Sequence, residues 1–166
     1  MPQKKKSSPP KLSTKEARQQ LESFIDKYTP EVAAIARATL KKMRKRLPGA
    51  VELVYDNYNA LAIGFGPSER AGEALFSIAL CPRWVNFFFI RGASLPDPDH
   101  VLQGAGNQAR HIRLQKAAQF DRPELQRLID ETIRRVKVSI DPTQPRRTEI
   151  RAVLAKQRPR RPPKKP

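Results

Sequence analysis

The sequence predicts an α+β domain in which helices pack on a mostly antiparallel sheet. Apolar residues recur at the helical period of about 3.6 up to residue 47, switch to a period of two after Gly49, and return to the helical period after Asp121. The predicted strands follow one another too closely for crossover helices, so neighbouring strands are expected to run antiparallel. Both ends of the 166-residue chain are basic and rich in proline, which places one folded domain between two tails.

Two helices are predicted before Gly49. Ser13 and Glu16 have the spacing of a capping box, and Thr29 precedes Pro30 as the cap and first residue of a second helix. The last turns of the second helix are strongly basic. Cations there suit the negative end of the helix dipole, and they would also suit a polyanion at the surface.

Five strands are predicted, at about residues 51–56, 60–65, 73–81, 84–91 and 110–115. In the second and third strands bulky residues occupy one face and mostly small residues the other, whereas the fourth strand is apolar on both faces. An antiparallel sheet with one face in solvent is expected to carry polar residues on that face, so a strand that is apolar on both faces indicates that its second face is also covered. We therefore expect a helix or tail segment to cover the second face, with a ligand pocket or a self-association surface as alternatives. The candidate pocket residues are Ala62, Gly64, Ser77, Trp84, Phe88, Gly104, Gly106 and His111.

A final helix is predicted from Asp121, and the folded domain is expected to span residues 13–141. Residues 1–12 and 142–166 contain too few large apolar residues to offset the entropy of ordering, so both are expected to be disordered. Residues 149–157 would form at most a marginal helix, which is too short to be stable alone.

The basic tails are the strongest chemical signal in the sequence. Residues 1–15 contain five Lys and no acid, and residues 142–166 contain nine Lys or Arg and one Glu, out of a net charge of +17. Flexible cationic arms bind polyanions by releasing counterions. We expect them to attach the domain to DNA, RNA or another polyanion, and the alternative is that they only keep the domain soluble. The predicted anion-binding residues are Lys4, Lys5, Lys6, Arg110, Arg113, Arg158, Arg160, Arg161, Lys164 and Lys165.

The loop before the last predicted strand contains a glycine pair, Gly104 and Gly106, that matches part of the dinucleotide-binding fingerprint. The fingerprint needs a strand before it and a helix after it, and here the order is reversed. The glycines are better explained as the end of a short helical turn that begins at Asp97. A glycine loop that gathers an anion beside Arg110 or Arg113 is the alternative.

Asp97, Asp99 and His100 are the predicted metal ligands, although Asp97 also fits a helix cap.

No complete catalytic constellation is present, and Cys81 is expected to be an inert core thiol. We therefore expect a binding protein rather than an enzyme, with no resident cofactor. An enzyme with a pocket over the small residues of the sheet is an alternative. The aromatic fourth strand lacks the glycines of an RNA-stacking strand, so that use is not favoured.

The N-terminus lacks the apolar region of a secretory signal, and no apolar run is long enough to span a membrane, so a cytoplasmic location is expected. A small molecule or a protein is expected as a further partner on the sheet.

Four segments of the chain, Phe87–Leu95, Asp97-Pro98, Leu102–Gly106 and Arg110–Leu114, resemble the pattern of the YdhG-like family. That pattern is an aromatic strand, an Asp-Pro turn, a glycine pair and a basic strand, and the resemblance covers about residues 16–137. It implies a frataxin-like α+β sandwich. Because at least one member is regarded as an iron chaperone for iron–sulfur and haem assembly, the resemblance also implies an iron carrier as an alternative function.

Overall fold

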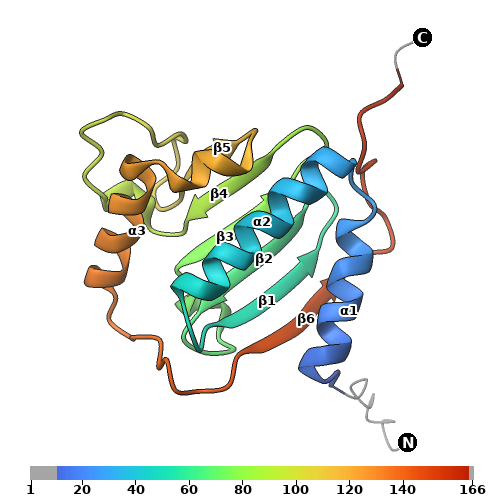
Figure 1. Cartoon of the computed structure of the whole chain (residues 1–166), viewed down its shortest axis with the longest axis horizontal. Coiled ribbons are helices and arrows are strands. Elements are labelled where there is room, and N and C mark those ends of the chain that lie inside the picture. Colours follow the sequence, from blue (N-terminus) through green and yellow to red (C-terminus); the bar gives the residue numbers. More distant parts are fainter. Residues whose placement is uncertain (1–10, 165–166) are drawn as a thin grey trace, which may run out of the picture.

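The computed structural model describes residues 11–164 as three α-helices and one six-stranded mixed sheet (Figure 1). The helices are α1 (Thr14–Ile25), α2 (Pro30–Arg46) and α3 (Pro123–Arg135). The strands are β1 (Val51–Asp56), β2 (Leu61–Gly66), β3 (Phe76–Leu80), β4 (Val85–Phe89), β5 (Arg110–Leu114) and β6 (Arg147–Val153), in the order β5-β4-β3-β2-β1-β6. The predicted α+β class is confirmed. None of the described helices is both long and apolar enough to cross a membrane.

Local capping sets the starts of the first two helices. The Ser13 hydroxyl accepts from the Glu16 amide at 3.1 Å and donates to the Glu16 carboxylate at 2.9 Å, which satisfies an amide at the start of α1. Thr29 accepts from the Val32 amide at 3.3 Å, and Pro30 occupies the first turn of α2.

The sixth strand corrects the prediction of five strands and a disordered C-terminal tail. Arg147–Val153 pairs in parallel with β1, so α3 is not the last element of the fold. The connection from α3 to β6 also packs closely, because a Cβ atom at Gly49 would collide with the carbonyl of Asp141. The pairing places Thr148 beside Glu52 on the helix-covered face, where Thr148 is 1% exposed. The folded sheet therefore continues well past residue 141.

The core lies between the helices and one face of the sheet (Figure 1). Four phenylalanines from β2, β3 and β4 are fully buried there, and the ring of Phe87 lies 5.2 Å from that of Phe89 and 5.5 Å from that of Phe120. These contacts tie the aromatic strand β4 to the turn that precedes α3. The bulky face predicted for the second and third strands is this core face.

The opposite face of the sheet, which we call the open face, is covered by none of the three helices (Figure 1). Its two central rows run across five strands, and their members are Tyr55, Ala62, Ala79, Asn86 and Arg113 in one row and Leu53, Gly64, Ser77, Phe88 and His111 in the other. Ala62, Ser77 and Phe88 are partly exposed. The expectation that a helix or tail covers this face is therefore wrong for residues 11–164.

Within residues 11–164, the β2–β3 loop and Lys11 shield the part of the open face nearest β6. Glu69 in this loop pairs with Arg147 at 3.7 Å and with Lys11 at 3.3 Å, and Leu53 is 2% exposed. The strands β2 to β5 keep their outer side chains accessible. Small residues on β2 and β3 leave this part of the face shallow.

Candidate nucleic-acid interface

Two hairpin turns lie at one end of the sheet. Residues 57–60 join β1 to β2, and residues 81–84 join β3 to β4. Because neighbouring strands are about 4.8 Å apart, the turns are separated by roughly 10 Å. The chain that follows β6 reaches the same end, where the amide of Arg158 donates to the carbonyl of Tyr58 at 2.8 Å. We call this region the hairpin end.

Trp84 and Arg113 form a stacked pair where the hairpin end meets the open face. The guanidinium carbon of Arg113 lies 3.8 Å from the centroid of the Trp84 ring. The β4–β5 register makes this contact, because Arg113 pairs with Asn86, two residues along β4 from Trp84. Arg113 is exposed and makes no ion pair with a carboxylate of residues 11–164. Its outer guanidinium plane is therefore free to meet a ligand.

Tyr58 forms a second aromatic–cation group at the tip of the β1–β2 turn. Tyr58 is 40% exposed, and the cationic groups of Lys156 and Arg158 lie 5.9 Å and 5.8 Å from the centroid of its ring. Neither cation is paired with a described carboxylate. Both come from the segment after β6, so the order of that segment is what brings them to Tyr58.

A buried ion pair holds that segment in place. Arg160 donates to the Asp56 carboxylate at 2.9 Å and to the carbonyls of Asn57 and Tyr58, and the whole residue is only 7% exposed. Lys27 donates to the other carboxylate oxygen of Asp56 at 2.9 Å. Arg160 was predicted to bind an external anion, and its burial corrects that prediction. Its guanidinium instead neutralises an internal carboxylate.

The electrostatic character of the hairpin end is positive. Residues 11–164 contain 29 Lys and Arg and all 16 Asp and Glu, a net charge of +13. The carboxylate of Asp56 at this end is buried and paired, so it does not offset the surface cations. The exposed cations near the two turns and after β6 are Arg83, Arg113, Lys156, Arg158, Arg161 and Lys164.

Phe88 and His111 extend the aromatic surface along the open face. Their ring centroids are 5.1 Å apart on adjacent strands. Burial lowers the pKa of His111, and the charge of Arg113 lowers it further. His111 is therefore a neutral imidazole at neutral pH, next to a permanent cation.

No family model, curated protein or solved structure matches this chain. The resemblance to the YdhG-like family, and the iron-carrier role that it implies, stay predictions. The chemistry of the site has to be judged from its own residues.

The predicted pocket residues fall into two groups. Ala62, Gly64, Ser77, Phe88 and His111 lie together on the open face, and Trp84 lies at its hairpin end. The glycine pair is separate, in the loop between β4 and β5.

The loop that contains Gly104 and Gly106 presents backbone carbonyl groups to Arg110. Arg110 donates through Nη1 to the carbonyls of Gly106 at 2.6 Å and Ala109 at 2.8 Å. Gly104 has a φ of +126°, which favours glycine, and it packs against the Arg110 side chain. Arg110 therefore fastens the loop, and the loop does not direct a ring of amides at an anion beside it.

The predicted metal ligands are engaged elsewhere. Both carboxylate oxygens of Asp97 accept backbone amides, from Val101 and Leu102 at 2.9 Å each, so this segment is a turn and not the predicted short helix. Asp99 pairs with Arg127 at 3.2 Å. Among residues 11–164, no group of three or more His, Cys, Asp or Glu side chains is placed to hold a metal ion.

The thiol of Cys81 lies at the hairpin end, in the turn before Trp84. Burial raises its pKa, and the charges of Arg113 and Arg160 act in the opposite direction without reversing the shift. The thiol is therefore protonated at neutral pH. Cys81 is only partly buried and lies outside the strands, so it is not the core residue that the sequence predicted.

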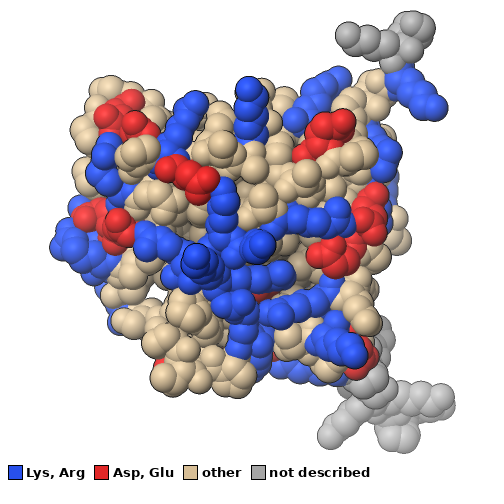
Figure 2. Space-filling view, in the orientation of Figure 1, with Lys and Arg blue, Asp and Glu red and all other residues tan. Residues whose placement is uncertain are grey.

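Most of the cations in the last turns of α2 form ion pairs with other parts of the fold. Lys42, Arg44 and Arg46 pair with Asp121, Glu52 and Asp130, on three different elements of the fold. Lys41 and Lys45 are exposed and make no such pair with described carboxylates. Figure 2 shows Lys and Arg gathered over the middle of the helix-covered face, around the C-terminal half of α2. This second basic surface carries charge without exposed aromatic rings.

Sequence reasoning missed Tyr58 and Lys156 and placed Arg158 in a tail. Lys4, Lys5, Lys6 and Lys165 lie outside the described residues. The one available signal for Tyr58 is an aromatic residue between two asparagines, in a segment that otherwise reads as a turn.

Proposed function

We propose that the protein binds single-stranded nucleic acid across the hairpin end and the adjoining open face. The observation that supports this most directly is the Trp84–Arg113 stack beside the cationic turn at Tyr58. Proteins that bind single strands combine aromatic rings or guanidinium planes, on which bases stack, with cations that follow the phosphates. Both components occur together at this end of the sheet.

The division of roles follows from exposure. Tyr58 and the outer plane of the Arg113 guanidinium stack with bases, since both are accessible. Lys156 and Arg158 neutralise phosphates and release counterions. The small side chains of Ala62 and Ala79 let the strand approach the open face between these points.

The second basic surface, around the C-terminal half of α2, is an alternative binding site of a different kind. It has cations but no stacking groups, so it favours a contact with phosphates alone. A strand bound there would leave the environment of Trp84 unchanged. This difference allows the two surfaces to be separated experimentally.

Trp84 is the only tryptophan, so its fluorescence reports directly on the proposed interface. The full chain is titrated with a single-stranded oligonucleotide of about 16 nucleotides. We expect saturable quenching of Trp84 fluorescence and a steep loss of affinity between about 50 and 200 mM salt. An affinity measured by anisotropy of a labelled oligonucleotide, with no change at Trp84, would place the strand elsewhere and contradict the proposal.

Two variants and two controls sharpen the test. Because stacking of one base on an aromatic ring contributes about 1–3 kcal/mol, Tyr58→Leu is expected to weaken binding by roughly 5- to 160-fold. Arg113→Gln removes one charge and one stacking plane, and it is compared with Arg122→Gln, which removes an exposed, unpaired charge at the start of α3. Equal losses in these two variants, or a larger loss in Lys41→Gln/Lys45→Gln than in Tyr58→Leu, would assign binding to charge on the other face.

A further inference from the structure

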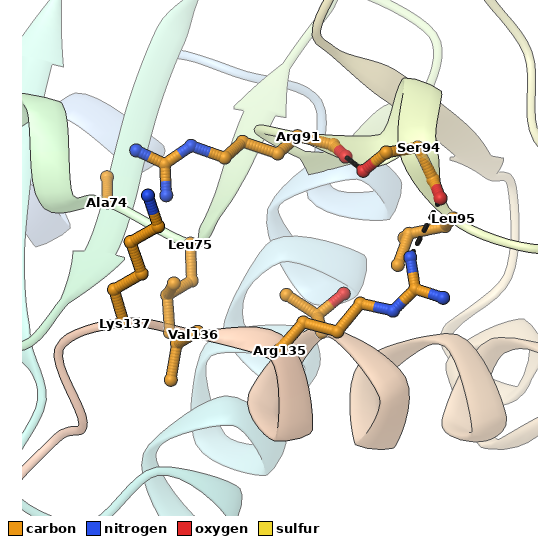
Figure 3. A pocket seen from close by; sticks show the side chains of 9 residues that line it. Ala74, Leu75, Arg91, Ser94, Leu95, Arg135, Val136 and Lys137 are labelled. Atoms are coloured by element: carbon orange, nitrogen blue, oxygen red, sulfur yellow. Dashed lines mark hydrogen bonds between the residues drawn. The ribbon is translucent and has the colours of Figure 1, made fainter.

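A cavity of about 320 Å³ lies at the end of the sheet opposite to the hairpin end (Figure 3). Its walls are the segment that leads into β3, the segment that follows β4, and the last turn of α3. Cavities that bind small molecules begin at about 300 Å³. None of the groups proposed to contact nucleic acid lines this cavity.

Three cations and no acid are among the residues that line it. The cations are Arg91, Arg135 and Lys137. Arg91 donates to the carbonyl of Gly72 at 3.3 Å and Arg135 to the carbonyl of Ser94 at 2.8 Å, and these backbone acceptors orient the guanidinium groups without neutralising them. Figure 3 shows Arg91 and Lys137 extending from opposite walls toward the same side of the cavity.

The distribution of carboxylates leaves this side of the cavity with uncompensated charge. Arg135 pairs with Glu131 at 2.6 Å, so its charge is partly balanced. Arg91 and Lys137 make no ion pair within the described chain. Two cations that share one side of a recess repel each other, and an anion placed between them relieves that repulsion.

The remaining wall is apolar. Leu75, Leu95 and Val136 line the cavity, and Leu75 and Val136 also border a second cavity of about 170 Å³. Leu75 is 6% exposed and belongs to the core, so this wall is firmly supported. An inorganic anion would contact the cations and leave this apolar surface unused.

We propose that this cavity binds a small organic anion, with its phosphate or carboxylate group between Arg91 and Lys137 and its apolar body against Leu75, Leu95 and Val136. The guanidinium of Arg91 suits either anionic group, because its planar fork matches two oxygens. The apolar wall selects for an aromatic or short aliphatic body. This site is independent of the nucleic-acid interface, since the two lie at opposite ends of the strands.

The test uses the isotope-labelled full chain and follows its backbone amide resonances by nuclear magnetic resonance. Phenyl phosphate, inorganic phosphate and phenol are titrated separately, so that the complete ligand chemistry is compared with each half. We expect phenyl phosphate to bind saturably, about tenfold more tightly than either of the others, with shifts centred on Ala74, Leu75 and Leu95. Equal affinities for phenyl phosphate and inorganic phosphate would overturn the proposal, as would shifts centred outside the cavity.

Variants identify which residues contact the anionic group of the ligand and which contact its apolar body. Arg91→Gln and Lys137→Gln are each expected to weaken phenyl phosphate about tenfold, because each removes a charged hydrogen-bond donor. Arg122→Gln, outside the cavity, is expected to leave its affinity unchanged. Leu95→Ala is expected to weaken phenyl phosphate but not inorganic phosphate. Unchanged binding in Arg91→Gln and Lys137→Gln, or displacement of phenyl phosphate by the oligonucleotide, would contradict an independent anion site.

Discussion

Arg160 and Asp56 form a buried ion pair that joins the C-terminal segment to the end of β1. Arg160 Nη2 lies 2.9 Å from Asp56 Oδ1, and the two side chains are 5% and 0% exposed. The pair fixes the course of residues 154–164, which carry Lys156 and Arg158 to the turn at Tyr58. The proposed interface therefore depends on an internal contact that no ligand touches.

Asp56→Asn is expected to destabilise the protein by about 3–5 kcal/mol, because it leaves the buried charge of Arg160 without its partner. Arg160→Met is expected to cost less, since Lys27 still neutralises Asp56. Urea unfolding of both variants measures the two costs. Lys42→Gln, which breaks an exposed pair with Asp121, is the control and is expected to cost less than about 1 kcal/mol. Equal losses in Asp56→Asn and Lys42→Gln would contradict the buried pair.

Asp56 also predicts how stability responds to acid. Burial alone would raise the pKa of Asp56, but hydrogen bonds from Lys27 and Gln157 and the charges of Lys27 and Arg160 hold it below its ordinary value of 3.8. The unfolded chain therefore binds this proton more readily than the folded chain. The stabilisation is complete above pH 3.8 and is lost as the pH falls through the lower, folded-state pKa. Unfolding free energies measured down this range are expected to fall more steeply for the wild type than for Asp56→Asn.

Tyr28 makes the opposite prediction at alkaline pH. Its hydroxyl accepts from the amide of Leu61 at 3.0 Å, and burial raises its pKa from 10.0 to about 12. The stabilisation is therefore present below pH 10 and is lost as the pH rises through about 12. Ultraviolet titration is expected to show a tyrosinate step near pH 12 that is missing in Tyr28→Phe. That variant is also expected to lose about 1–3 kcal/mol of stability, since the Leu61 amide loses its acceptor.

His111 predicts a pH dependence of nucleic-acid binding. Its pKa is lowered in the free protein, so the imidazole is neutral beside Arg113. A bound phosphate would favour the charged form, and binding would take up a proton. Affinity is expected to rise as the pH falls between about pH 8 and 5, and His111→Gln is expected to flatten this part of the curve. Oligonucleotide anisotropy across the range measures both, and an identical slope in the variant would exclude His111 from the interface.

Removal of β6 tests its part in the fold. A chain that ends at residue 146 loses the parallel partner of β1 together with Arg160, and we expect it to lose more stability than Arg160→Met, which removes the ion pair but keeps β6. A chain that ends at residue 163 keeps both features and is expected to match the wild type. Thermal unfolding followed by circular dichroism compares them. Equal stability of the two shortened chains would show that β6 is dispensable.

Local signals in the sequence were sufficient for part of this fold. The caps at Ser13 and Thr29 involve residues only three positions apart, and the alternation of Leu61, Ile63 and Phe65 identifies the buried face of β2 without knowledge of its neighbours. These patterns are decided by short-range chemistry. They predicted the α+β class.

The sixth strand could not be predicted in that way. Only Thr148 and Ile150 of this strand contact the core side, and arginines flank them in the sequence. The strand forms because it pairs with the free edge of β1, which lies about 96 residues earlier in the chain. Composition therefore favoured a tail. The burial of Glu52 and Asp56 was hidden for the same reason, since the arginines that neutralise them depend on tertiary structure.

Sequence patterns identified several residues of the candidate site but not their roles. Trp84, Phe88, His111 and Arg113 were singled out, but as pocket or anion-binding residues. Their stacking depends on the β4–β5 register, which residue patterns do not specify. Tyr58 was missed because its importance comes from cations about 98 and 100 residues later in the chain.

The parallel pairing of β6 with β1 has a consequence for the protein while it is being made. When β1 to β5 have left the ribosome, the outer edge of β1 still presents free amide and carbonyl groups, because β6 lies later in the chain and has not yet emerged. For that interval the nascent chain has an edge that a strand of any neighbouring chain can occupy. Pairing of β6 closes that edge, so the latest strand in the chain also protects the sheet from association with its neighbours.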